Sequence, residues 1–80
     1  MIGGIREIDL HGCNVHQARI AIDAALKRSR GLYRFRLIHG SNSGHALRDM
    51  IRTTYKSHPA VVRMELGLNQ GQTDLVLREF

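Results

Sequence analysis

Apolar positions along the chain follow two different spacings, and the two alternate. Every second position is apolar in four short stretches, which is typical of strands with one buried face. In two longer stretches the apolar positions recur every three or four residues, as in amphipathic helices. In chain order, the pattern predicts strand, helix, strand, helix, strand and strand over residues 5–10, 15–29, 33–39, 45–57, 61–66 and 73–77.

Individual residues support the helix ends and the buried faces. Asn14 is a favoured N-cap, and Gln17, three positions later, completes a capping box. His58-Pro59 stops the second helix, because the residue before a proline avoids the helical conformation. The positions expected to be buried in the two helices and the third strand are Val15, Ala18, Ile22, Ala25 and Leu26, then Leu47, Met50, Ile51 and Thr54, then Val62, Met64 and Leu66.

The order of elements predicts one α/β domain (an α+β two-layer sandwich) over residues 1–80. Eighty residues leave no room for a second core. Strands that alternate with helices imply right-handed crossovers and parallel pairing of the first strands. The last two strands are close enough for a hairpin, so we expect a mixed four-stranded sheet with two helices on one face.

The helix-free face of this sheet should carry charged side chains. Arginines and carboxylates alternate with the apolar positions of the strands, which indicates a ladder of cross-strand ion pairs. For the arginines, contact with RNA is an equal alternative. The residues concerned are Arg34, Arg36, Arg63 and Arg78, with Glu7, Glu65 and Asp74.

Charge and composition narrow the class of protein. The chain has twelve basic and seven acidic residues, which gives a net charge of +5 and a pI near 10.4. Such a balance is typical of a nucleic-acid binder, and arginine suits contact with phosphate, although solubility alone is a simpler explanation. A single cysteine fits a reducing compartment. No signal peptide or apolar run of about 20 residues is present, so we expect a cytoplasmic protein without a membrane span.

Two strands run into a His-Gly pair that is followed by a helix. The pairs are His11-Gly12 and His39-Gly40, and the second continues as a Ser-Asn-Ser-Gly turn. Neighbouring parallel strands end at the same sheet edge, where helix N-termini favour anions. We therefore expect Asp9, His11, His39 and the turn to share one neighbourhood that handles phosphate.

Histidine and a neighbouring carboxylate are suited to phosphodiester cleavage. An imidazole can remove a proton from a ribose 2′-hydroxyl or protonate a leaving oxygen, and a carboxylate can fix its tautomer. Backbone N–H groups and an arginine can stabilise the charge on phosphorus. The alternative is that His11 and His39 only cap strands by hydrogen bonds to backbone.

Metal and cofactor sites have weaker support. His11, Cys13 and His16 are potential metal donors, but no fourth ligand has zinc-like spacing. Asp9 could hold Mg²⁺, although a two-metal nuclease needs more carboxylates nearby. The turn lacks the Walker A and Rossmann glycine patterns. We therefore expect no resident cofactor.

Five short motifs follow one another along the chain. They are Asp9-Leu10-His11-Gly12, Leu37-Ile38-His39-Gly40-Ser41-Asn42-Ser43-Gly44, Leu47-Arg48, Ser57-His58-Pro59-Ala60-Val61 and Gly71-Gln72-Thr73. Together they resemble the Smr (small MutS-related) domain family, over about residues 8–77. That resemblance implies a fold similar to the C-terminal domain of translation initiation factor three. It also implies a nicking or RNA-cleaving endonuclease, or a nucleic-acid-binding module, in which the Asp-x-His motif cleaves and the His-Gly loop binds substrate. Asn42, Asn69 and Gln70 stand where the family often has glycine.

The combined hypothesis is an endonuclease that cleaves RNA or DNA. Asp9, His11 and His39 are the candidate catalytic residues. The candidates for nucleic-acid contact are Gly40, Ser41, Asn42, Ser43, Gly44, Arg48, Arg34 and Arg36. Two alternatives stay open: a non-catalytic binding module, for example one that brings a partner to ribosomes or repair complexes, and a protein-interaction domain.

Overall fold

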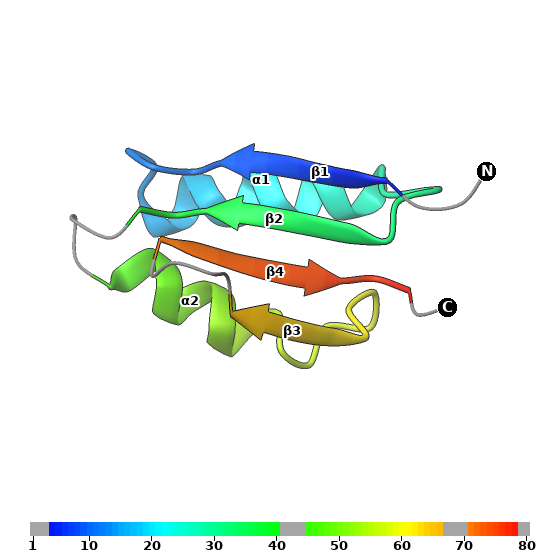
Figure 1. Cartoon of the computed structure of the whole chain (residues 1–80). Coiled ribbons are helices and arrows are strands. Elements are labelled where there is room, and N and C mark those ends of the chain that lie inside the picture. The colour runs from blue at the N-terminus through cyan, green and yellow to red at the C-terminus, as the bar shows by residue number, and fades with distance from the viewer. Residues whose placement is uncertain (1–3, 41–44, 67–70, 79–80) are drawn as a thin grey trace.

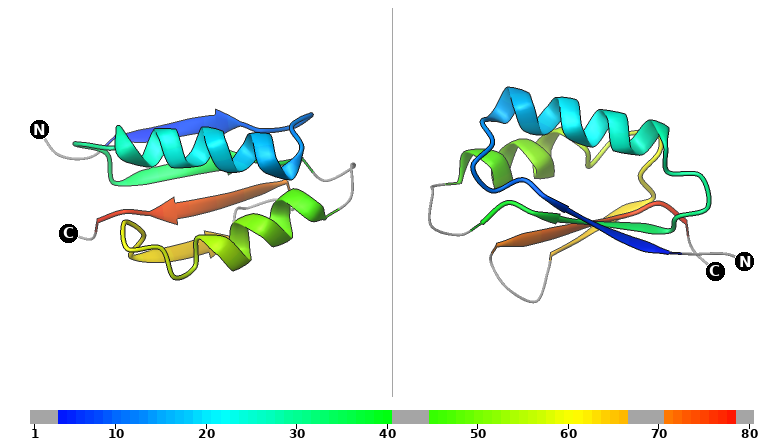
Figure 2. Two further views of the ribbon diagram at one scale, coloured as in Figure 1. Left: turned by 180° about the vertical axis from the view of Figure 1, so that it is seen from behind. Right: turned by 90° about the horizontal axis from the view of Figure 1, so that it is seen from above.

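A computed structural model describes residues 4–40, 45–66 and 71–78 of the chain. It has two layers, a four-stranded sheet and two helices that both lie on one face of it (Figure 1; Figure 2). The predicted order of elements and the two-layer fold are confirmed. The elements are β1 (Ile5–Asp9), α1 (Val15–Lys27), β2 (Arg34–Ile38), α2 (Ala46–Thr54), β3 (Arg63–Leu66) and β4 (Gln72–Val76).

The sheet is mixed and has the strand order β1-β2-β4-β3. β1 and β2 are parallel, with Asp9 opposite Ile38, whereas β4 runs antiparallel to both β2 and β3. The parallel first pair and the final hairpin were both predicted. As a result the carboxyl ends of β1 and β2 lie at the same sheet edge as the start of β4, where Gln72 pairs with Ile38.

The core lies between the sheet and the two helices. Phe35, Leu37 and Leu75 come from the two central strands and are fully buried. Ile22 of α1 and Ile51 of α2 close over them at 1% and 0% exposure. Because alternate residues of a strand point to opposite faces, the residues between these core positions in β2 and β4 face away from the helices.

Four expected core positions are exposed in the structure. Val15 is the first residue of α1 and Thr54 is the last residue of α2, which ends three residues earlier than the pattern predicted. Val62 precedes β3 and is 54% exposed, and Leu66 at its other end is 64% exposed. β3 is an edge strand, so the helix layer covers only its middle, where Met64 packs against the core.

Candidate nucleic-acid site

The first candidate residues lie where β1 ends. Leu10 follows the strand, is buried, and donates its backbone N–H to the carbonyl oxygen of Ile38 at 2.7 Å. The chain then turns at Gly12, whose φ of 86° is a conformation that favours glycine. This turn carries His11 just beyond the sheet edge, where its side chain is 74% exposed.

Asp9 and His11 form a hydrogen-bonded pair. Oδ1 of Asp9 lies 2.8 Å from Nδ1 of the imidazole and accepts the backbone N–H of His11 at 3.1 Å. The side-chain hydrogen bond and then the backbone one lower the pKa of Asp9. An ionised carboxylate only accepts hydrogen bonds, so Nδ1 carries a proton. In the neutral ring the Nε2 lone pair is then left for another partner.

The capping box predicted for α1 is confirmed. Oδ1 of Asn14 accepts the backbone N–H of Gln17 at 2.7 Å, and the Gln17 side chain accepts the Asn14 N–H at 3.0 Å. These two bonds fix the helix start directly after the His11 turn. The residues between Asp9 and α1 are therefore held at both ends.

The second His-Gly pair lies beside the first. The backbone N–H groups of His39 and Gly40 both donate to the carbonyl oxygen of Gly71, at 2.9 and 3.1 Å. Gly40 has a φ of 81°, and a Cβ built on it would lie 3.7 Å from the Cβ of His11. The predicted approach of the two His-Gly pairs at one sheet edge is thus confirmed, while the turn over residues 41–44 lies outside the described residues and the roles of all these residues stay predictions.

The His39 ring differs from the His11 ring because it is buried. His39 is 2% exposed, and both of its ring nitrogens have partners. Nδ1 donates to the carbonyl oxygen of Gly40 at 3.1 Å, and Nε2 accepts from the Thr73 hydroxyl at 3.0 Å. In this arrangement no ring nitrogen of His39 is left for a ligand.

Arg52 of α2 extends this set of hydrogen bonds. Its Nε lies 3.4 Å from Oγ1 of Thr73, so the hydroxyl connects Arg52 to His39. Burial lowers the pKa of His39, and the charges of Arg52 and Arg48 lower it further. The lowered pKa favours the neutral ring, which links helix α2 to the backbone at Gly40.

Of the remaining turn candidates, Arg48 is described and the others are not. Ser41, Asn42, Ser43 and Gly44 lie outside the described residues. Arg48 is in the first turn of α2, and its Nε donates to Oδ1 of Asp49 at 3.2 Å. Its side chain is 27% exposed. Its positive charge lowers the pKa of His39.

Arg34 and Arg36 lie on the helix-free face, among carboxylates. Arg34 bridges Asp74 and Glu65 with its two terminal nitrogens at 2.8 and 2.6 Å. Arg36 donates to Asp74 at 3.3 Å and lies 3.9 Å from Glu7. The predicted ladder of cross-strand ion pairs is confirmed here. It directs both guanidinium groups to carboxylates within the sheet and not to the sheet edge where the two His-Gly turns meet.

The described residues provide few features of a metal site. Within residues 4–40, 45–66 and 71–78, no three His, Cys, Asp or Glu side chains come together as potential metal ligands. Asp9 could offer one carboxylate, whose Oδ1 is already an acceptor for His11. Over the same part of the chain, neither helix is long and apolar enough to cross a membrane.

Two residues of this region, Thr73 and Arg52, were not among the predicted site residues, although Thr73 belongs to the Gly71-Gln72-Thr73 motif. Thr73 is fully buried on the core side of β4, where it pairs with Leu37 on one side and Leu66 on the other. A polar residue in phase with Leu75 was the available signal, because a buried hydroxyl needs a partner. The partner itself depends on strand register, which the sequence pattern does not specify.

Comparisons with known proteins agree with this geometry. The family model for the Smr domain matches residues 8–74. Endonuclease MutS2 of Thermus thermophilus is 44% identical over 50 residues, which are 60% of this chain and 7% of that protein. The chain thus corresponds to a small part of that relative.

A solved structure supports the same relationship. The crystal structure of the Smr domain of Thermus thermophilus MutS2 superposes with a TM-score of 0.84 at 32% identity. The match covers 92% of this chain and 99% of that one. The residues matched by the family model include the β1 end, the His39 turn and the start of β4. The chain therefore belongs to the Smr domain family.

Proposed function

We propose that the chain binds RNA or DNA at the carboxyl ends of β1 and β2 and cleaves a phosphodiester bond there. The observation that carries the proposal is the 2.8 Å contact between Oδ1 of Asp9 and Nδ1 of His11. It orients an exposed imidazole so that Nε2 is available as a general base. Membership of the Smr family and the name of the relative, an endonuclease, support the same interpretation.

With RNA, the proposed reaction starts at the ribose 2′-hydroxyl. Nε2 of His11 takes its proton, and the oxygen attacks the adjacent phosphorus. The bond from phosphorus to the 5′ oxygen then breaks, and that oxygen receives a proton from the imidazolium or from water. The products are a 2′,3′-cyclic phosphate and a 5′-hydroxyl. DNA lacks the 2′-hydroxyl, so His11 would have to activate water, and the ends would be a phosphate and a hydroxyl.

Other residues of the region have supporting roles in this proposal. Asp9 holds the His11 tautomer and stabilises the imidazolium that forms. His39 is buried, so we assign it a positioning role: it fixes the backbone at Gly40, where the phosphate-binding turn begins. We assign Arg48, in the first turn of α2, to contact with a phosphate of the bound strand. Arg34 and Arg36 are occupied by carboxylates, so the proposal does not depend on them.

Cleavage assays on matched variants test the catalytic proposal. We expect His11→Ala to slow cleavage by a factor of about 10²–10⁴, because general base catalysis contributes about that much. Asp9→Asn, which removes the negative charge beside the imidazole, should also slow cleavage. His16→Ala, which replaces an exposed histidine in the first turn of α1, is the control and should cleave normally. Equal cleavage by the parent and His11→Ala would refute the assignment.

Two further readouts separate the alternatives. Cleavage should persist when EDTA is added to the assay, because the proposed step uses no metal. Loss of cleavage in EDTA would assign a role to a divalent metal such as Mg²⁺. Binding is measured beside cleavage with the same oligonucleotides. Salt-sensitive binding without cleavage would make the chain a non-catalytic binding module. No binding near 150 mM salt would favour a protein-interaction domain.

A further inference from the structure

The positive charge of the chain is concentrated on its helix layer. On the helix-free face, Arg34, Arg36 and Arg63 are matched by three carboxylates, those of Glu7, Glu65 and Asp74. Residues 15–30 and 46–56, which contain both helices, carry seven basic and two acidic side chains. This excess of five equals the net charge of the chain. A polyanion is therefore attracted to the helix layer and not to the bare sheet.

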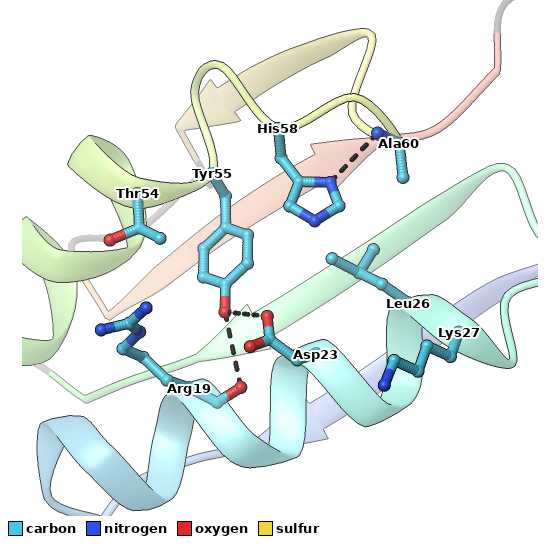
Figure 3. A pocket seen from close by; sticks show the side chains of 8 residues that line it. All are labelled: Arg19, Asp23, Leu26, Lys27, Thr54, Tyr55, His58 and Ala60. Atoms are coloured by element: carbon cyan, nitrogen blue, oxygen red, sulfur yellow. Dashed lines mark hydrogen bonds between the residues drawn. The ribbon is translucent and has the colours of Figure 1, made fainter.

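A pocket of about 430 Å³ opens in this layer between α1 and the end of α2 (Figure 3). Arg19, Asp23 and Lys27 line it from α1, four residues apart and so on one side of the helix. Tyr55 and His58 line it from the other side. Among the described residues neither Arg19 nor Lys27 has an ion-pair partner, so both charges are available to a ligand.

His58 offers a fixed hydrogen-bond donor to the pocket. Its Nδ1 accepts the backbone N–H of Ala60 at 3.0 Å, so the neutral ring carries its proton on Nε2. Figure 3 shows Nε2 directed toward the space between Tyr55 and Leu26. The ring is also held in place by a contact with the Tyr55 ring, with centroids 5.7 Å apart.

Asp23 offers an acceptor in the same pocket. Its Oδ1 accepts the Tyr55 hydroxyl at 2.7 Å, which fixes the carboxylate. Its second oxygen has no hydrogen-bond donor among the described residues. Leu26 and Ala60 add an apolar part to the lining. The pocket thus combines two cations, a neutral donor on His58, an acceptor on Asp23 and an apolar part of the lining.

This combination fits a nucleotide better than a phosphate ion. A lone phosphate would lie against the Asp23 carboxylate and would leave Leu26 and Ala60 without an apolar partner. An unpaired base has apolar faces for Leu26 and Ala60, and an edge that can both donate and accept. A carboxylate accepts well from the exocyclic amino group of a base such as cytosine, whereas uracil presents a carbonyl oxygen at the same position. The cations Arg19 and Lys27 suit the flanking phosphates.

We propose that the α1–α2 pocket binds one unpaired nucleotide of a single strand, with an amino-bearing base against Asp23 and His58 and its phosphates on Arg19 and Lys27. The inference rests on the proposed nucleic-acid binding and adds a second contact to it. Asp23 lies eight residues into α1, roughly 12 Å along the helix axis from its start beside the His11 turn. A strand a few nucleotides long could therefore reach both places.

NMR titration of the whole chain with small probes tests the pocket directly. The probes are cytidine 5′-monophosphate, uridine 5′-monophosphate and inorganic phosphate at equal concentration. We expect cytidine monophosphate to shift the amide signals of Asp23, Tyr55 and His58 most. Equal shifts with the uridine compound, or with phosphate alone, would overturn the assignment of the base. Asp23→Asn keeps an acceptor for Tyr55 and should remove the preference for cytidine.

Oligonucleotides test whether the nucleotide belongs to a strand. A cytidine hexamer should bind more tightly than free cytidine monophosphate, and a hairpin duplex should leave the pocket signals unchanged. Arg19→Gln with Lys27→Gln should weaken hexamer binding about tenfold and reduce the salt slope by about 0.7 for each phosphate that is no longer neutralised. Arg6→Gln with Arg78→Gln, which replaces two exposed arginines outside the helix layer, controls for the change in net charge. Parent-like binding by the double variant would refute the pocket.

The same spectra separate this inference from the proposed function. Shifts at Leu10, His11 and Gly40 without shifts at Asp23 and His58 would reject the pocket and leave the proposed site standing. Shifts confined to the pocket, with cleavage that survives His11→Ala, would support the pocket and reject the catalytic assignment.

Discussion

Tyr55 and Asp23, thirty-two residues apart in the chain, are joined by a hydrogen bond of 2.7 Å between the phenol and the carboxylate. Tyr55 follows α2 directly and is fully buried, whereas Asp23 lies on the exposed side of α1. The bond connects the two helices across their groove. Burial and then this carboxylate raise the pKa of Tyr55 well above its ordinary value, so the phenol stays protonated, and a donor, in neutral and mildly alkaline solution.

Removal of this hydroxyl should destabilise the chain. We expect Tyr55→Phe to lower the free energy of unfolding by about 1 kcal/mol, because the net value of one hydrogen bond is about 0.5–1.5 kcal/mol and water can solvate the exposed Asp23. Urea denaturation monitored by circular dichroism measures the change. Asp23→Asn, which keeps an acceptor for the phenol, should cost less. An unchanged midpoint for Tyr55→Phe would contradict the expectation.

Stability should also fall in acid because of Asp9. Its pKa is lower in the folded chain than in the unfolded one, so it contributes stability above the unfolded value, near 3.8, and this is lost as pH falls through the folded value. Glu65, held by Arg63 and Arg34, acts in the same direction. Urea midpoints measured from pH 6 to pH 2 should fall less steeply for Asp9→Asn than for the parent. Parallel curves would show that Asp9 is not held by His11.

His39 should take up its proton at a lower pH in the folded chain than in the unfolded chain. Burial lowers its pKa below the ordinary histidine value of about 6.5, so the unfolded chain is protonated first as pH falls. The stability that this group contributes is present above pH 6.5 and is lost as pH falls through the folded pKa. A pH titration followed by long-range ¹H–¹⁵N spectra should place the midpoint of His39 below 6.5, with the proton of the neutral ring on Nδ1. A midpoint at or above that value would contradict the burial argument.

The link from Arg52 to His39 predicts a specific effect at Thr73. Thr73→Val preserves shape but removes the hydroxyl, which leaves Nε2 of His39 buried without a partner. We expect a loss of about 1–3 kcal/mol in the free energy of unfolding. Thr53→Val, which replaces an exposed threonine of α2, is the matched control and should cost a few tenths of a kcal/mol at most. Equal effects of the two substitutions would exclude a role for the hydroxyl.

Substitution of Arg34 distinguishes the two interpretations of the arginines. Asp74 is 3% exposed and accepts from Arg34, so Arg34→Gln leaves a buried carboxylate with only its weaker partner, Arg36. We expect a loss of about 2–3 kcal/mol in stability. Affinity for an oligonucleotide, measured where the variant is folded, should be unchanged. A selective loss of affinity with parental stability would instead favour nucleic-acid contact.

Much of this architecture follows from local patterns. The order of elements, the parallel first pair and the capping box at Asn14 depend on spacing and on neighbours in sequence, so the sequence predicts them. The approach of His11 to Gly40 follows because parallel neighbours end at one sheet edge. The Asp9–His11 hydrogen bond joins residues only two apart in the chain, so it too could be predicted from the sequence.

Other contacts depend on how distant elements meet. His39 and His11 share a local motif, yet one is buried and the other exposed, because β2 is central and β1 is at the edge of the sheet. The hydrogen bond between Thr73 and His39 can be predicted only when the register of β2 and β4 is known. The bond between Asp23 and Tyr55 likewise depends on how α1 packs beside α2. Periodicity assigns a residue to a face of its element but does not predict its partner on another element.

The matched charges on the helix-free face have a consequence for how the molecule rotates as it approaches a charged partner. With its carboxylates and arginines matched there, and its excess positive charge over α1 and α2, the chain has a permanent electric dipole directed through its two layers. In the field of any polyanion such a particle rotates before it touches, and presents its helices first. This pre-orientation raises the rate of productive encounters and fades as added salt shortens the reach of the field.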